Sequence, residues 1–140
     1  MSALNNPSVL WTPLSKTVTF DGGVGSGAQG TVLVFTVTGQ VEIGAMVPRS
    51  LVTPVGTGGT LVLGTAGTIN LFVASTVGTT MTGGKFWLPS IVDELALPAA
   101  LKEIILDGNI ILTIGVHDLS AGSLRFDILW RPLSAGALVA

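Results

Sequence analysis

Apolar and polar side chains alternate with a period of two residues in several stretches of this sequence, most clearly between Ser123 and Arg131. Every second position there is large and apolar, and the intervening positions include three charged residues. Successive side chains of a β-strand point to opposite faces, so this pattern predicts a strand with one buried and one solvated face. The apolar set is Leu124, Phe126, Ile128 and Trp130, and the charged set is Arg125, Asp127 and Arg131.

Other stretches have the composition of strands, because β-branched Val, Ile and Thr dominate them. The stretch Val41–Val47 also alternates. Thr31–Thr38 and Ile110–Val116 are apolar on both faces, as expected of strands at the centre of a sandwich or beneath a neighbouring subunit. In the stretch Val41–Val47, the face expected to be buried holds Val41, Ile43, Ala45 and Val47. Shorter strands are expected at Thr17–Phe20, Thr60–Leu63, Ile69–Ala74 and Lys85–Leu88.

The region from Ser90 to Leu106 fits a helix in some parts and a strand in others. Pro98 lies in its middle and limits any helix to a turn or two, because proline lacks the backbone donor that a helix needs. The following residues, Asp107-Gly108-Asn109, are typical of a hairpin turn, since Gly and Asn accept positive φ. They predict a hairpin that joins Leu101–Leu106 to Ile110–Val116.

These patterns predict an all-β fold: an antiparallel β-sandwich or jelly roll of about eight strands with extended N- and C-terminal arms. We expect an N-terminal arm over residues 1–15, a single sandwich domain over residues 16–131, and a C-terminal arm over residues 132–140. Both ends are short and irregular in composition, and such arms fray unless a neighbouring molecule holds them.

Composition indicates that the folded chain associates with other proteins. Only 10% of the 140 residues are charged while 48% are hydrophobic, against about 25% charged in an ordinary soluble domain. A chain of this size cannot bury all of its apolar surface in one core. No charged residue stands between Arg49 and Lys85, yet Gly and Thr interrupt this stretch too often for a spanning helix. We therefore expect homo-oligomerisation, with a trimer as the first expectation, and no membrane partner.

Net charge and residue inventory exclude several kinds of chemistry. A net charge of −2 gives no basic surface for direct nucleic-acid contact, and the lack of cysteine excludes disulfides and thiolate sites. Gly25–Gly30 matches the glycine spacing of a dinucleotide-binding loop, but the residues that follow predict a strand where that site needs a helix. Oxygen ligands near Asp93-Glu94 and Asp107 are too few for calcium.

His117 and Asp118 are the obvious starting points for acid–base chemistry, with Ser120 and Ser123 nearby in sequence. Adjacent residues at a strand end point to opposite sides, however, so these two are poorly placed to pair. We predict a protein that is not an enzyme, with no catalytic residues, no cofactor and no metal. The alternative for these residues is a small hydrolase that acts through His117.

Large apolar side chains near both ends predict an interface with a capsid or a neighbouring subunit. A similar pentapeptide, Trp-x-Pro-Leu-Ser, stands at 11–15 and at 130–134. An exposed indole is a typical anchor in a protein interface, although Trp11 fits a core position equally well and Trp130 shares the apolar face of its strand. The predicted interface residues are Leu10, Trp11, Pro13, Leu14, Trp130, Pro132 and Leu133.

The sequence also resembles small structural proteins encoded with the head genes of tailed bacteriophages. The resemblance lies in Val18–Gly23, Thr31–Gly39, Ile110–Thr113 and Leu129–Ser134. It implies a virion component on the capsid exterior, a decoration or cement protein that binds the major capsid protein as an oligomer and resides in the host cytoplasm during assembly. The alternative is a receptor- or glycan-binding module of a head fibre or tail, in which Trp87 and Thr79–Thr82 contact a sugar.

Overall fold

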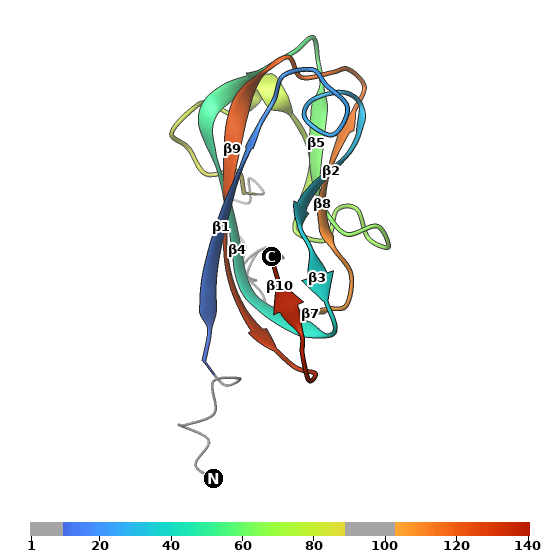
Figure 1. Ribbon diagram of the computed structural model, residues 1–140. Coiled ribbons are helices and arrows are strands. Elements are labelled where there is room, and N and C mark those ends of the chain that lie inside the picture. The colour runs from blue at the N-terminus through green and yellow to red at the C-terminus, as the bar shows by residue number, and fades with distance from the viewer. Residues whose placement is uncertain (1–9, 89–102) are drawn as a thin grey trace.

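Two four-stranded antiparallel sheets face each other in the computed structural model, which describes residues 10–88 and 103–140. Figure 1 shows β1, β9 and β4 in one layer and β2, β8 and β5 in the other. Sheet A contains, in spatial order, β1 (Thr12–Thr19), β9 (Ala121–Pro132), β4 (Val41–Val55) and β7 (Ile104–Leu106). Sheet B contains β2 (Gly30–Phe35), β8 (Ile110–Gly115), β5 (Thr60–Gly64) and β6 (Val73–Val77).

The strand order defines a jelly roll. In sheet A, β9 lies between β1 and β4, and in sheet B, β8 lies between β2 and β5. The chain passes repeatedly from one sheet to the other. Two four-stranded sheets connected in this way make the double Greek key of a jelly roll. The predicted all-β sandwich of about eight strands is confirmed.

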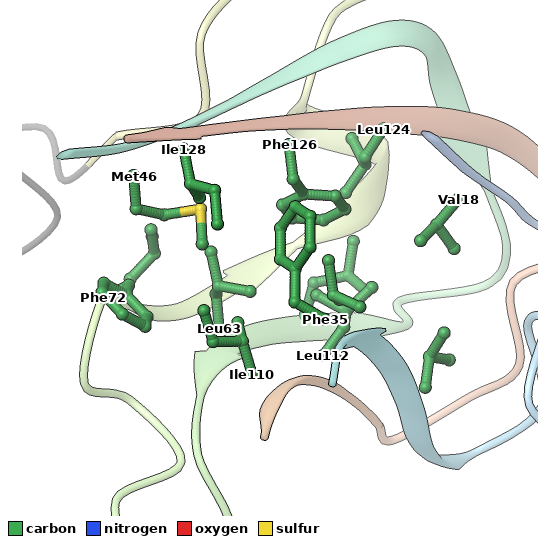
Figure 2. Packing of buried hydrophobic residues seen from close by; sticks show 14 of the residues in the cluster. Val18, Phe35, Met46, Leu63, Phe72, Ile110, Leu112, Leu124, Phe126 and Ile128 are labelled. Atoms are coloured by element: carbon green, nitrogen blue, oxygen red, sulfur yellow. The ribbon is translucent and has the colours of Figure 1, made fainter. Parts of the chain in front are cut away.

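The apolar faces of both sheets meet in one core. Figure 2 shows Phe126, Leu124 and Ile128 of β9 packed toward Phe35 of β2 and Leu112 of β8. The predicted alternation of β9 is confirmed, because its apolar set is buried and the charged set is only partly covered. The side chains that are nearly or fully excluded from solvent include Phe35, Phe72, Phe126, Ile43, Met46, Leu61, Leu63, Ile110, Leu112, Ile114, Leu119 and Leu124.

Strand β4 departs from the predicted alternation at Gly44. Ile43 pairs with Trp130 and Ala45 pairs with Leu129, so one extra residue of β4 stands opposite a single step of β9. This β-bulge reverses the side-chain phase. Met46 is fully buried, whereas Ala45 and Val47, predicted on the inner face, lie on the outer face.

The predicted hairpin around residues 107–109 is wrong. Strand β7 pairs with β4 in sheet A, whereas β8 pairs with β2 and β5 in sheet B, so the turn passes between the sheets. Asn109 holds this crossing, because its side-chain oxygen accepts a hydrogen bond from the Val37 amide at 2.8 Å. Residues 90–102 of the ambiguous region lie outside the described residues.

Two of the shorter predicted strands also differ in extent. The strand expected at Ile69–Ala74 begins later, as β6. The strand expected at Lys85–Leu88 is reduced to one bridge between Phe86 and Arg49, followed by a hydrogen bond from the Trp87 amide to the Pro48 carbonyl. This short segment extends sheet A beyond β4.

Both predicted arms are shorter than expected, because parts of them belong to the sheets. Residues 12–15 form the first half of β1, which pairs with β9 along its whole length. The C-terminal residues fold back as β10 (Leu138–Val139), which pairs with β3 (Val37–Thr38) and buries Val139. Figure 1 shows this small ribbon at the lower end of the sandwich. Residues 1–9 lie outside the described residues.

Candidate interaction surface

All three arginines of the chain lie on the outer face of sheet A. Arg125 and Arg131 belong to the outward set of β9, and Arg49 of β4 pairs directly with Arg125. Residues opposite each other in neighbouring strands share a face, so the pairing places these guanidinium groups on one surface. The adjacent Pro48 and Ser50 are buried on the inner side, which agrees with the outward position of Arg49.

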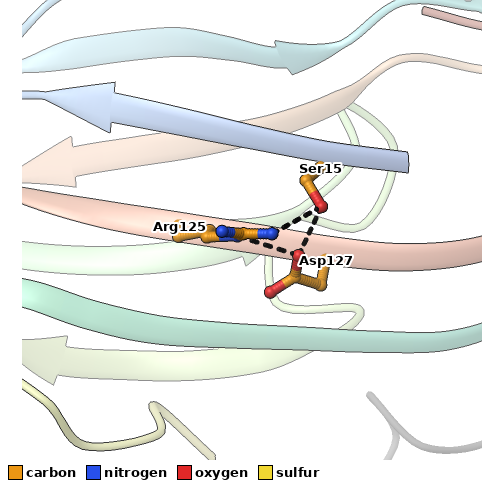
Figure 3. A network of polar contacts seen from close by, with 3 residues as sticks. All are labelled: Ser15, Arg125 and Asp127. Carbon is orange, nitrogen blue, oxygen red and sulfur yellow. Dashed lines mark hydrogen bonds and ion pairs between the residues drawn. The ribbon is translucent and has the colours of Figure 1, made fainter. Parts of the chain in front are cut away.

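One polar network joins β1 to β9 across this face (Figure 3). Arg125 Nε donates to Asp127 Oδ1 at 3.0 Å, and its Nη2 donates to Ser15 Oγ at 3.2 Å. Ser15 Oγ donates in turn to the same carboxylate oxygen. Partial burial raises the pKa of Asp127, but these hydrogen bonds and the charges of Arg125 and Arg49 outweigh it, so that this pKa lies below its ordinary value.

A second cluster, formed by Arg131, Glu42 and Trp11, lies at the other end of the face. Both Arg131 Nε and Arg131 Nη2 lie 2.7 Å from Glu42 Oε2, and the guanidinium carbon lies 4.6 Å from the centre of the Trp11 ring. The Glu42 side chain is only 11% exposed. The indole also covers Gly44, where an added Cβ would approach its ring to 2.9 Å. The missing side chain at the bulge therefore makes room for Trp11.

An apolar recess of about 190 Å³ lies between these two polar clusters. Pro13 of β1, Leu129 of β9 and Ala45 and Val47 of β4 line it, together with parts of Leu14, Ser15, Asp127 and Ile128. We call it the sheet A recess. Its volume is below the roughly 300–1,000 Å³ of small-molecule sites, so it matches one or two aliphatic side chains better than a cofactor or a sugar.

The residues predicted as an interface divide into exposed and buried groups. Leu10, Pro13 and Leu133 are exposed, Trp11 and Pro132 are half-buried, and all five lie around the Trp11 end of sheet A. Leu14 and Trp130 point toward the core instead. Trp130 is only 7% exposed and Leu14 packs against the core cluster, so their predicted contact with a partner does not fit this placement.

Trp87, the residue proposed for sugar stacking, is buried. Its side chain is 3% exposed, and its ring Nε1 donates to Thr76 Oγ1 at 3.0 Å. Thr79, Thr80 and Thr82 are exposed, but Met81 between them faces inward. A sugar-binding platform needs an exposed ring face, so this part of the glycan hypothesis is wrong.

The carboxylates of Asp118 and Asp21 accept hydrogen bonds that hold loops of the fold. Asp118 accepts the Gln29 amide at 2.8 Å, which ties the β8–β9 connection to the glycine-rich loop, while His117 is exposed. Asp21 organises that loop: hydrogen bonds from Ser26 and the Gly23 amide hold the pKa of Asp21 below its ordinary value. Gly30 opens strand β2 directly, as the sequence predicts.

Within residues 10–88 and 103–140, no group of three metal-ligating side chains comes together, and no helix is long and apolar enough to cross a membrane.

The interface predicted from the sequence gathers at one end of sheet A and does not include Arg49, Ala45 or Val47. Simple alternation predicts Ala45 and Val47 on the inner face, and the bulge at Gly44 reverses this placement. Arg49 had one available signal: together with Glu42 it supplies the only charges of the fifteen-residue strand β4.

The fold defines this chain as a single jelly-roll protein, and the comparison with solved structures agrees. No protein-family model and no curated protein matches the sequence. A chain from the acid-stable capsid structure of Helicobacter pylori bacteriophage KHP30 is similar in structure, with a TM-score of 0.53 and 10% sequence identity. The match covers 94% of this chain and 95% of that chain, so the likeness extends over the whole jelly roll.

Proposed function

We propose that this chain is a non-enzymatic structural protein of a bacteriophage virion, a decoration or cement protein that binds the exterior of the head shell. The supporting observation is the full-length likeness to a chain from a phage capsid. Since the match covers nearly all of both chains, the KHP30 chain is of similar length and adds little to the same jelly roll. Small jelly rolls of this kind recur in viral capsids.

The surface properties support a binding role in such an assembly. Exposed apolar side chains and three arginines share the outer face of sheet A, and a rigid sheet holds them in fixed positions. Rigid positioning lowers the ordering cost of binding. A protein that contacts several shell subunits at once would strengthen the shell by linking them, and an oligomer gains further through effective concentration.

We infer a homo-oligomer, with a trimer as the expected state, because a ring of copies suits a symmetry axis of a shell. The outer face of sheet B offers surface for contacts between copies, since its four strands carry no charged residue. The major capsid protein is the proposed partner on the shell.

Co-sedimentation with shells assembled without this protein tests the proposal. The protein should pellet with the shells at a fixed ratio and raise the temperature at which they release DNA. Light scattering on the free protein should give about three times the chain mass of 14.2 kDa. Shells that sediment without bound protein would overturn the proposed function, whatever the oligomeric state.

A further inference from the structure

Arg49, on the outer face of sheet A, has a side-chain donor without an acceptor among the described residues. Its Nε is buried and has no hydrogen-bond partner among the residues that the structure describes. A buried donor without an acceptor lowers the stability of the fold. The carboxylate of Asp127, whose pKa is lowered in part by the charge of Arg49, already accepts from Ser15 and Arg125. Among the residues that the structure describes, Arg49 therefore has no acidic ion-pair partner of its own.

The outer face of sheet A carries more positive than negative charge. Arg125 and Arg131 each have an acidic partner, Asp127 and Glu42, at 3.0 Å and 2.7 Å. Arg49 is the third arginine, opposite Arg125 on the neighbouring strand. The outer face of sheet A is thus locally cationic on a chain whose net charge is −2. A carboxylate is the complementary group, because a guanidinium binds it through a planar fork of donors.

The sheet A recess lies directly beside Arg49. Ala45 and Val47 precede Arg49 at steps of two along β4, so all three point outward in one row. On the other side of Arg49, its bridge partner Phe86 is 65% exposed. The cation therefore stands between a recess sized for an aliphatic side chain and an exposed aromatic ring.

We propose that this row binds an acidic segment of the shell protein, in which one aliphatic side chain fills the sheet A recess and a neighbouring carboxylate pairs with Arg49. The inference rests on the proposed function and specifies the chemistry of its partner. A protein segment fits better than a phosphate polymer, because Asp127 and Glu42 lie on the same face and would repel a continuous line of phosphates.

Three variants and one matched control test the inference by co-sedimentation with the same shells. Arg49→Gln removes the charge and should weaken binding at least tenfold, whereas Arg49→Lys keeps the charge, loses the fork and should weaken it less. Ala45→Phe fills the recess and should weaken binding at least tenfold. Lys16→Gln removes one charge from β1 at an exposed position paired with Phe126, away from the outer face, and should bind like the unmodified protein.

Salt and thermal measurements complete the experiment. A charged contact weakens with ionic strength, so the difference between Arg49→Gln and the unmodified protein should narrow as salt rises. Melting temperatures of all variants verify that they are folded. Arg49→Lys keeps the inference testable if Arg49→Gln does not fold.

The outcomes separate the two proposals. If the unmodified protein does not bind shells, the proposed function fails and this inference fails with it. If it binds and Arg49→Gln and Ala45→Phe bind equally well, only this inference is wrong. If the Arg49 variants change the mass of the free protein while shell binding is unaffected, the occupant of the face is a second copy, and the inference is overturned as well.

Discussion

The two sheets of the sandwich are alike inside and different outside. Both inner faces are apolar and belong to one core. The outer face of sheet A carries all three arginines and the acids Asp127 and Glu42, whereas the four strands of sheet B contain no charged residue. Folding explains the inner faces, because each sheet must bury one side. It does not require such unequal outer faces, and this asymmetry matches the different contacts proposed for the two sides.

The largest effect is expected from truncating one core side chain in each sheet, which compares how much the two inner faces contribute to the free energy of unfolding. Phe126 at the centre of sheet A and Leu112 at the centre of sheet B are both fully buried. Phe126→Ala should lower the free energy of unfolding by about 3–5 kcal/mol and Leu112→Ala by about 2–5 kcal/mol, as measured by urea denaturation. A loss below about 1 kcal/mol for either variant would show that its sheet does not pack as described.

The second prediction separates the two ion pairs of sheet A. Arg131→Met leaves the Glu42 carboxylate, which is 11% exposed, without its cation, and should cost about 2–3 kcal/mol because an uncompensated charge is poorly hydrated. Arg125→Met is the matched control. The Arg125–Asp127 side chains are 40% and 37% exposed, so its loss should cost about 0.5–1 kcal/mol.

Urea denaturation of both methionine variants measures the difference. Equal costs would contradict the distinction between a covered pair and an exposed one. Replacing Glu42 by Gln in the Arg131→Met background should recover part of the lost free energy of unfolding, since the buried charge is then removed.

The third prediction compares a glycine in each sheet. Gly44→Ala brings a methyl group to 2.9 Å from the Trp11 ring, which is held by Arg131, and should lower the free energy of unfolding by about 1–2 kcal/mol through overpacking. In sheet B, Gly115→Ala meets only the Thr60 hydroxyl at 3.0 Å. That side chain can rotate, so the change should stay within about 0.5 kcal/mol. Equal thermal shifts would contradict the packing role of Trp11.

The smallest predicted effect is the contribution of Asp127, on the outer face of sheet A, to the pH dependence of stability. The pKa of Asp127 lies below its ordinary value in the folded protein, so its ionised form stabilises the fold above the unfolded pKa of about 3.9. That contribution is lost as pH falls through the folded pKa. Asp127→Asn should therefore be less stable at pH 7, by up to about 1 kcal/mol.

Urea denaturation at a series of pH values tests this sign. The difference between Asp127→Asn and the unmodified protein should narrow below about pH 4. A difference that grows on acidification would contradict the assignment of Asp127 as a stabilised carboxylate.

Much of the fold follows from local sequence periodicity. The alternation in β9 predicts its buried and exposed sets correctly, and the two-sided apolar pattern of Ile110–Val116 correctly indicates a central strand, because β8 lies between β2 and β5. These properties depend on neighbours along one strand. The pairing of β7 with β4, by contrast, depends on residues far apart in sequence, and the local turn residues 107–109 carry no information about which sheet follows.

The interaction surface was only partly predictable for the same reason. The similar pentapeptides at 11–15 and 130–134 lie on the paired strands β1 and β9, so the predicted interface residues gather in space. Arg49 joins them only through the register of β4, and Ala45 and Val47 reach the outer face only because of the bulge at Gly44. A single inserted residue in a strand thus decides which side chains the outer face of sheet A presents.

Site-specific labelling on the shell tests the central claim most directly. The chain has no cysteine, so Val47→Cys on the outer face of sheet A and Thr113→Cys on the outer face of sheet B each supply a unique thiol at a half-buried position. Reaction rates with a small thiol reagent are compared between the free and the shell-bound protein. We expect shell binding to protect Cys at position 47 and to leave Cys at position 113 as reactive as in the free protein. Protection at position 113 with full reactivity at position 47 would contradict the account.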